Sequence, residues 1–393
     1  MRTHASWLFE PPAGVRSPSM PRDFSPWLDA LRAGAALTVL FGHMAHVRFA
    51  GGDYYFLREW NVASDAVAVF FVLSGVVIAY ASERDGTLGR FAFHRLTRIA
   101  SVLVPALLLT MAFDAIGTRI DMSAYPKGYY QELSPGEFLF RGLTLTNLWT
   151  GTGDWVRLGS NGPIWSLSYE VAFYLIFGTL IFLKGQLRVT VLALMVLLSG
   201  VPILVMLPAW YAGVLTWHIA SRSQGQRSRA AYRRIAVGSL LCLLCLKVTG
   251  VPLVLESLTA TALAPNNHHH LLVYSNEVLW NAVIAVGLAI HLMAVWRLTE
   301  GLPSRAPMAM TRLIRWIAGG SFSLYLVHYP TLQLLDALLP DDLPGHNIWM
   351  LLITLAVCFA FAALFERPIK SFRAALQTLA HRSLSGERVA KSP

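Results

Sequence analysis

Long apolar runs separated by short polar connections dominate the chain from Trp27 onward. Most are close to the 20 or so residues that an α-helix needs to cross a bilayer. The pattern predicts an all-α fold, a polytopic integral membrane helical bundle of about ten transmembrane helices. The sixth run is short enough to belong to a bent or re-entrant element, and we expect the turn before it near Pro208. The runs are 27–47, 62–81, 99–117, 163–183, 189–207, 209–221, 235–255, 277–296, 316–337 and 347–366.

The composition fits a membrane protein and argues against other classes. Of 393 residues, 55% are hydrophobic and only 14% are charged, whereas a soluble domain carries about 25% charged residues. Three cysteines, each within an apolar run, do not suggest a disulfide framework. The formal charge of +10 could suggest nucleic acid, but the basic residues fall in short blocks between apolar runs. We therefore expect membrane lipid, and no nucleic acid, as a partner.

The distribution of basic residues predicts the orientation. Alternate connections, together with the two ends of the chain, hold 24 of the 32 Lys and Arg, and the remaining connections hold 6. Such a bias marks the cytoplasmic side, so both termini should be cytoplasmic. We divide the chain into a mobile cytoplasmic N-terminal arm (1–26), a transmembrane domain (27–372) and a basic cytoplasmic tail (373–393).

Arg32 and His43 lie eleven residues apart in the first run, on one face of a helix and about 16 Å apart along its axis. Ionisable groups in a span are costly and mark a site or a water-filled cavity by default. The alternative is that each side chain reaches toward one membrane interface. Asp29, three positions before Arg32, either pairs with it or is an acid near the cytoplasmic interface.

Three further charged residues stand out. Arg95 and Arg98 lie in the connection just before the third run. They either anchor the helix at the cytoplasmic interface or bind phosphate oxygens, which guanidinium groups match well. Glu170 lies among aromatic residues about two turns into the fourth run, where a carboxylate needs a partner. It could contact His43 or tie helices together.

Other polar residues have structural explanations. Asp65 opens the second run as an acid favoured at a helix start, and Ser74-Gly75 in the same run resembles a close-packing notch. We expect Glu366 to pair with a basic residue and Lys247 to reach an interface.

His328 lies in the ninth run, where Pro330 should bend the helix. The outer segment 118–162 could cap a site. Three consecutive histidines, 268–270, do not share a face, so we expect no metal site there.

Six strings in this sequence resemble, in order, motifs of the membrane acyltransferase 3 family. They cover about residues 25–370, and six in order make the resemblance specific. The strings are LDALRAGAALTVLFGH, DAVAVFFVLSGVVIAY, HRLTRIASVLVP, GPIWSLSYEVAFYL, GSFSLYLVHYP and FERP. One departure is mild: Ala-Gly-Ala follows the first Arg where many members have Gly-Ile-Ala.

The resemblance implies an integral-membrane enzyme with about ten spans that transfers acetyl or other short acyl groups, usually from acyl-CoA, to carbohydrate or other acceptors. It implies that His43 is the catalytic histidine and Arg32 its essential partner. Arg95 and Arg98 match the family's Arg-x-x-Arg pair, and Glu170 matches the acid of the Trp-Ser-Leu-x-x-Glu motif.

The resulting hypothesis is an acyltransferase of the bacterial inner membrane with no tightly bound cofactor. Arg95 and Arg98, with Arg32 deeper, would bind the acyl-CoA donor. His43 would act as general base or as acyl carrier, and Glu170 could orient its ring. The acceptor would be a carbohydrate or a lipid-linked glycan. A transporter or flippase and a scaffold for a polysaccharide synthase are the alternatives, and neither would release CoA from acetyl-CoA.

Overall fold

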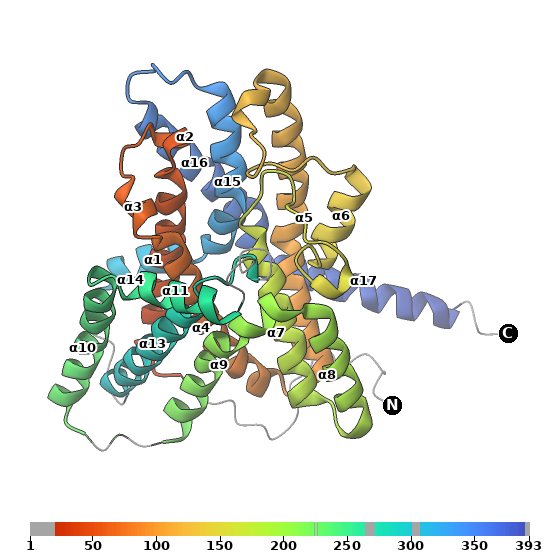
Figure 1. Ribbon diagram of the computed structural model, residues 1–393. Coiled ribbons are helices and arrows are strands. Elements are labelled where there is room, and N and C mark those ends of the chain that lie inside the picture. Colours follow the sequence, from red (N-terminus) through yellow and green to blue (C-terminus); the bar gives the residue numbers. More distant parts are fainter. Residues whose placement is uncertain (1–19, 224, 226, 264–271, 301–306, 390–393) are drawn as a thin grey trace.

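The computed structural model describes residues 20–223, 225, 227–263, 272–300 and 307–389. Those residues form helices joined by short connections, with isolated β-bridges as their only extended pairing (Figure 1). The predicted all-α helical bundle is therefore confirmed. The longer helices are α1 (Phe24–Met44), α4 (Val62–Asp85), α5 (Leu88–Ile120), α7 (Ile164–Phe182), α8 (Gly185–Ser199), α9 (Val201–Arg222), α10 (Arg229–Val248), α11 (Val251–Leu263), α13 (Val278–Thr299), α14 (Met308–Ala318), α15 (Ser321–Leu338), α16 (His346–Phe361) and α17 (Ile369–Val389).

Shorter helices lie in the connections: α2 (Val47–Ala50), α3 (Phe56–Glu59) and α6 (Pro135–Thr144). A π-helical turn, Ala362–Glu366, joins α16 to α17, and α17 extends away from the bundle toward the right of Figure 1. The predicted boundary at residue 373 falls inside α17. Residues 1–19 of the predicted arm and the histidines at 268–270 lie outside the described residues.

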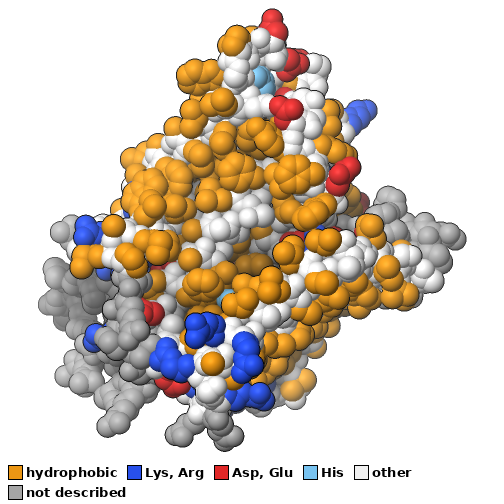
Figure 2. Space-filling model, turned by 90° about the vertical axis from the view of Figure 1, so that its left-hand side faces the viewer, with side chains coloured by type: hydrophobic (Ala, Val, Ile, Leu, Met, Phe, Trp, Pro, Cys, Tyr) orange, Lys and Arg blue, Asp and Glu red, His pale blue; other side chains and the backbone are white. Residues whose placement is uncertain are grey.

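Six helices among the described residues are long and apolar enough to span a membrane, and α10 with α11, bent by 68°, makes a seventh. The six are α4, α5, α7, α9, α13 and the helix that runs from α16 into α17. The protein is thus a multi-pass membrane protein, and the count of ten spans stays a prediction. In Figure 2 one face of the molecule is mainly hydrophobic, with Lys and Arg side chains grouped toward its lower end.

The helix breaks fall at glycines rather than at the expected proline. The prediction of a turn at Pro208 is wrong, because Pro208 lies inside α9 and the break is at Gly200, where φ is +78°. Glycine adopts this left-handed conformation at little cost. Gly250, also at φ +78°, separates α10 from α11. A proline removes only one helical hydrogen bond, which a helix packed among neighbours tolerates.

The predicted notch at Ser74-Gly75 is confirmed by the contact between α4 and α9. A Cβ on Gly75 would lie 2.2 Å from the Trp210 carbonyl oxygen, and a Cβ on Gly213 would lie 2.0 Å from the Val72 oxygen. Two facing glycines thus let the backbones of α4 and α9 touch. This contact holds α4 firmly in the centre of the bundle.

Lys247 pairs with Asp65, which is therefore more than a helix-start acid. The Lys247 Nζ lies 2.5 Å from Asp65 Oδ2, with side chains 12% and 24% exposed. Trp280 Nε1 donates to the other carboxylate oxygen at 2.7 Å. Two opposite charges inside a bundle offset part of the cost of losing their hydration by attracting each other. This ion pair joins α4 to α10.

Candidate active site

Two cavities, each of about 160 Å³, lie toward opposite ends of α1. We call the first the arginine cavity; its lining includes Arg32, Arg95, Arg98, Ser74, Ser166, Glu170, Tyr174 and Tyr325. We call the second the histidine cavity; it is lined by His43, His46, Arg58, Tyr129, Arg157, Gly162, Pro163, Trp165, Tyr274 and Tyr329. Arg32 and His43 therefore open into different cavities.

In the arginine cavity, two of three guanidinium groups are paired with carboxylates. Arg32 lies 2.8 Å from Asp29, as the alternative of an i, i+3 pair predicted, and Arg98 lies 3.4 Å from Glu366. Glu366 thus has the basic partner expected of it. In the described part of the chain Arg95 has no ion pair, and its Nε is buried without a hydrogen-bond partner. Arg95 is therefore the guanidinium most available to a ligand.

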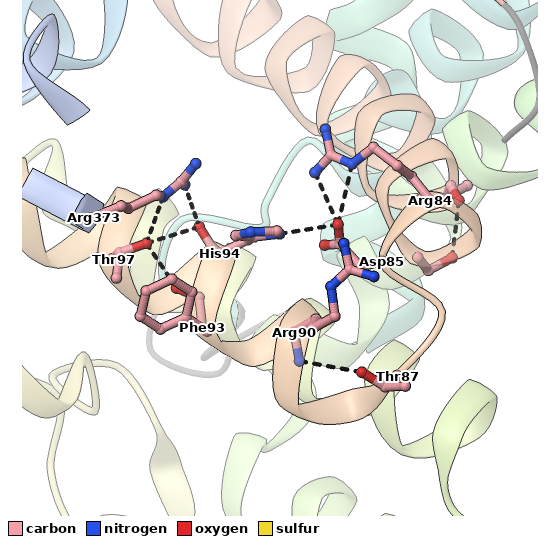
Figure 3. Close-up of polar contacts among 10 residues, drawn as sticks. Arg84, Asp85, Thr87, Arg90, Phe93, His94, Thr97 and Arg373 are labelled. Carbon is pink, nitrogen blue, oxygen red and sulfur yellow. Dashed lines mark hydrogen bonds and ion pairs between the residues drawn. The ribbon is translucent and has the colours of Figure 1, made fainter. Parts of the chain in front are cut away.

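Other basic residues near Arg95 make structural contacts: Arg84 at the end of α4, His94 on α5 and Arg373 on α17. Arg84 and His94 both contact the fully buried Asp85, at 3.0 and 2.9 Å (Figure 3). Arg373 of α17 donates to Thr97 Oγ1 at 2.9 Å and to the His94 carbonyl at 2.8 Å. These contacts fix the N-terminal part of α5, from which Arg95 projects.

Glu170 lies in the arginine cavity and is not bonded to His43. Its Oε1 accepts hydrogen bonds from Ser74 Oγ and from Tyr174 Oη, the latter at 2.5 Å. Trp210 Nε1 donates to Ser74 Oγ at 3.2 Å. The suggested contact with His43 is therefore wrong. The other alternative, that Glu170 ties helices together, describes the structure, and the helices are α7 and α4. Spacing alone could not show this, because it does not say which helices face each other.

The partner of His43 is His328. His43 Nδ1 lies 3.0 Å from His328 Nε2, and the rings are stacked 5.2 Å apart. His328 Nδ1 lies 2.8 Å from the carbonyl oxygen of Leu324, which can only accept, so Nδ1 must carry a proton. In the neutral ring, His328 Nε2 then accepts, and His43 Nδ1 donates to it. His43 Nε2 is left unprotonated, with its lone pair free on a ring that lines the histidine cavity.

The turn of α15 that carries His328 is held by Asn161. Pro330 has no N–H, so the carbonyl of Leu326 loses its helical donor. Asn161 Nδ2 donates to this oxygen at 2.9 Å and to Thr110 Oγ1 at 3.0 Å. The helix continues through Pro330, and the asparagine before Gly162 supplies the missing bond. The Asn-Gly-Pro turn is therefore fastened to α15 next to His328.

The outer segment covers one side of the histidine cavity, as suggested. Tyr129 and Arg157 come from it, and Tyr129 Oη lies 2.9 Å from His46 Nε2. Tyr329 lies edge-on to His43 with ring centroids 5.2 Å apart. Sequence reasoning noted His328 but missed its pairing with His43. It also missed Arg157 and Tyr329, for which the only signal was their place beside quoted motifs.

A layer of side chains separates the two cavities. Along α7, Trp165 lines the histidine cavity and the next residue, Ser166, lines the arginine cavity. Ser166 Oγ lies 2.6 Å from Tyr325 Oη, and the Tyr325 ring is 6.2 Å from that of His328. The hydroxyl pair on one side and the histidine pair on the other are therefore neighbours across this layer.

Comparison with known proteins identifies the family. Residues 25–367 match the acyltransferase 3 family, described as an acyltransferase domain. The chain is 33% identical over 174 residues to acyltransferase MdmB of Streptomyces mycarofaciens. That match covers 42% of this chain and 40% of the relative. No solved structure matches significantly. Because the family match covers most of the chain, this protein belongs to the acyltransferase 3 family and carries its acyltransferase domain.

Proposed function

We propose that the protein transfers an acyl group, most simply acetyl, from acyl-CoA to a hydroxyl of a carbohydrate or lipid-linked glycan. The donor binds in the arginine cavity and the acceptor in the histidine cavity, with His43 between them. The observation that carries this proposal is the free Nε2 of His43, whose Nδ1 is committed to His328. Family membership and the relative's name support the acyltransferase part.

The arginine cavity suits the phosphate-bearing end of acyl-CoA. Arg95 has no ion pair in the described part of the chain, whereas Arg32 and Arg98 are each partly neutralised by a carboxylate. Guanidinium groups bind phosphate oxygens through paired, charge-assisted hydrogen bonds. Arg32 therefore acts with the donor-binding residues rather than as the chemical partner of His43.

At the histidine cavity, Nε2 of His43 takes the proton of the acceptor hydroxyl as general base. The alkoxide oxygen attacks the thioester carbonyl carbon, a C–O bond forms and the C–S bond breaks. The CoA thiolate leaves and takes the proton back from His43, so the enzyme is restored. His328 accepts the Nδ1 hydrogen bond throughout and holds the ring in the tautomer that this step needs.

The layer between the cavities must open for the thioester to reach His43. The Ser166–Tyr325 hydroxyl pair lies in this layer, and the pantetheine arm has to displace it. The same free nitrogen could attack the thioester itself and carry the acyl group. We favour general-base catalysis because it transfers the acyl group in one covalent step, without an acyl-enzyme intermediate.

The orientation follows from the charge distribution. The basic connections lie on the side where α5 begins with Arg95 and Arg98, which agrees with a cytoplasmic donor. We place the protein in a bacterial inner membrane with both termini cytoplasmic. The histidine cavity then faces outward, where surface glycans are modified.

The test is incubation of membranes containing the protein with acetyl-CoA labelled in the acetyl group. Acyl transfer releases free CoA and leaves the label on an acceptor, and both signals disappear in a His43→Ala variant that inserts normally. A transporter or flippase would release no CoA. CoA release that is unchanged in His43→Ala would contradict the proposal.

A further inference from the structure

We propose that the acceptor is anionic, a sugar that carries a carboxylate or phosphate group, and that Arg157 and Arg58 bind this group in the histidine cavity. The inference rests on the proposed function, because it names the class of acceptor presented to His43. It starts from the cavity's charges. Two guanidinium groups line it, and its described lining includes neither Asp nor Glu.

Neither guanidinium forms an ion pair with a carboxylate among the residues that the structure describes. Several other arginines in the described part of the chain form salt bridges with carboxylates; Arg48, for example, lies 4.0 Å from Asp336. Arg58 and Arg157 form no salt bridge there. Both are partly buried beside His43. Partly buried, unpaired cations of like charge are costly to keep together. A bound anion offsets that cost, whereas a cationic acceptor would add to it.

Arg157 is held in one position by three contacts. Its backbone N–H donates to Gln131 Oε1 at 2.7 Å, and its Nη2 donates to Tyr274 Oη at 3.2 Å. Its Nη1 lies against Gly162, where a Cβ would be only 2.2 Å away. Gly162 is absent from the residues with positive φ. The glycine of the Asn-Gly-Pro turn is therefore needed for space, so that the guanidinium can reach the cavity.

The wall next to Arg157 suits a sugar ring. Trp165 and Tyr274 are stacked 4.8 Å apart at an angle of 12°, and both line the cavity. Such rings offer an apolar face together with polar edges. Tyr129 and Tyr329 line the same space. A flat aromatic wall and two cations together match an anionic sugar better than a neutral or basic one.

The test measures binding without measuring transfer. The full-length protein in lipid nanodiscs is treated with diethyl pyrocarbonate, and modification of His43 and His46 is followed by mass spectrometry. Methyl glucuronide and glucose 6-phosphate serve as anionic probes, and methyl glucoside as the neutral match. A charge-assisted hydrogen bond is stronger than a neutral one, so we expect either anion to protect at about a tenfold lower concentration than the glucoside. The anion that protects at the lower concentration shows whether the site prefers a carboxylate or a phosphate.

Two variants tie the effect to the proposed residues. Arg157→Gln keeps a hydrogen-bonding side chain near Tyr274 but loses the charge, and Gly162→Ala pushes the guanidinium away. Both should lose the preference for anions. Gly34→Ala is the matched control, because nothing lies within 4 Å of a Cβ at Gly34. Equal protection by glucoside and glucuronide, no protection by either anion, or a preference that survives in Arg157→Gln would overturn the inference.

The outcome also separates the inference from the proposed function. Charge-selective protection in a protein that releases no CoA from acetyl-CoA would keep the anion site and remove the acyltransferase mechanism. CoA release that requires His43, without charge-selective protection, would do the reverse.

Discussion

The two cavities handle their cations in opposite ways. In the arginine cavity, Asp29 and Glu366 each neutralise one guanidinium and leave Arg95 unpaired. In the histidine cavity, neither Arg58 nor Arg157 has a carboxylate partner in the described part of the chain. One bundle thus holds a cavity in which charge is largely balanced and another in which it is not. This contrast supports the proposal that an anion binds at the end of the bundle remote from the basic connections.

The largest expected effect is on the rate of acyl transfer, and it tests whether the chemistry takes place in the histidine cavity. His43→Ala removes the proposed base and should lower the rate of acyl transfer by about 10²- to 10⁴-fold. Donor affinity should hardly change, because His43 lines the histidine cavity only. Steady-state kinetics in membranes with equal amounts of inserted protein measure both quantities. A large rise in donor KM with an unchanged kcat would contradict the assignment of catalysis to His43 and of donor binding to the arginine cavity.

The next effect concerns the donor. Arg95→Ala removes the unpaired guanidinium of the arginine cavity, and hydrogen bonds to charged groups are worth about 1.5–3 kcal/mol. We therefore expect donor KM to rise about 10- to 150-fold, with the acceptor KM little changed. Arg222→Ala is the control, since this arginine is exposed and pairs with Glu83. Unchanged donor dependence in Arg95→Ala would count against phosphate binding.

A smaller effect tests the pairing of the two histidines. His328→Ala leaves the His43 Nδ1 hydrogen without its acceptor, a loss of about 0.5–1.5 kcal/mol for a neutral hydrogen bond. We expect kcat to fall about 2- to 10-fold. His328→Gln, which offers a carbonyl oxygen to the same hydrogen, should recover part of the rate. If Gln and Ala behave alike while the pH profile stays that of the parent, the tautomer argument fails.

The smallest effect on transfer comes from a site outside both cavities. Lys247→Met leaves Asp65 without its cation, and breaking a buried ion pair costs about 3–5 kcal/mol of stability. We expect a clearly lower Tm in detergent, restored in part by the double variant Lys247→Met with Asp65→Leu. The transfer rate per folded molecule should not change. A selective loss of rate at equal stability would connect this ion pair to one of the cavities.

Parts of the fold were readable in the sequence for physical reasons. Apolar runs predicted the helices because the bilayer requires about 20 apolar residues from any span. The notch at Ser74-Gly75 was visible because small residues have few other uses inside a span. The positions of the helix breaks could not be predicted from the sequence, because a packed helix can accommodate a proline, as Pro208 and Pro330 show. Gly200 broke the helix instead.

The sequence by itself determined an all-α membrane bundle, its charge asymmetry and the residue types that could do acyl-transfer chemistry. Only the tertiary structure decided which of them meet. Periodicity places side chains on a face of one helix, whereas contacts depend on which helices pack together across the bundle. For that reason Arg32 and His43, on the same helix, open into separate cavities, while His43 and His328, 285 residues apart, share a hydrogen bond.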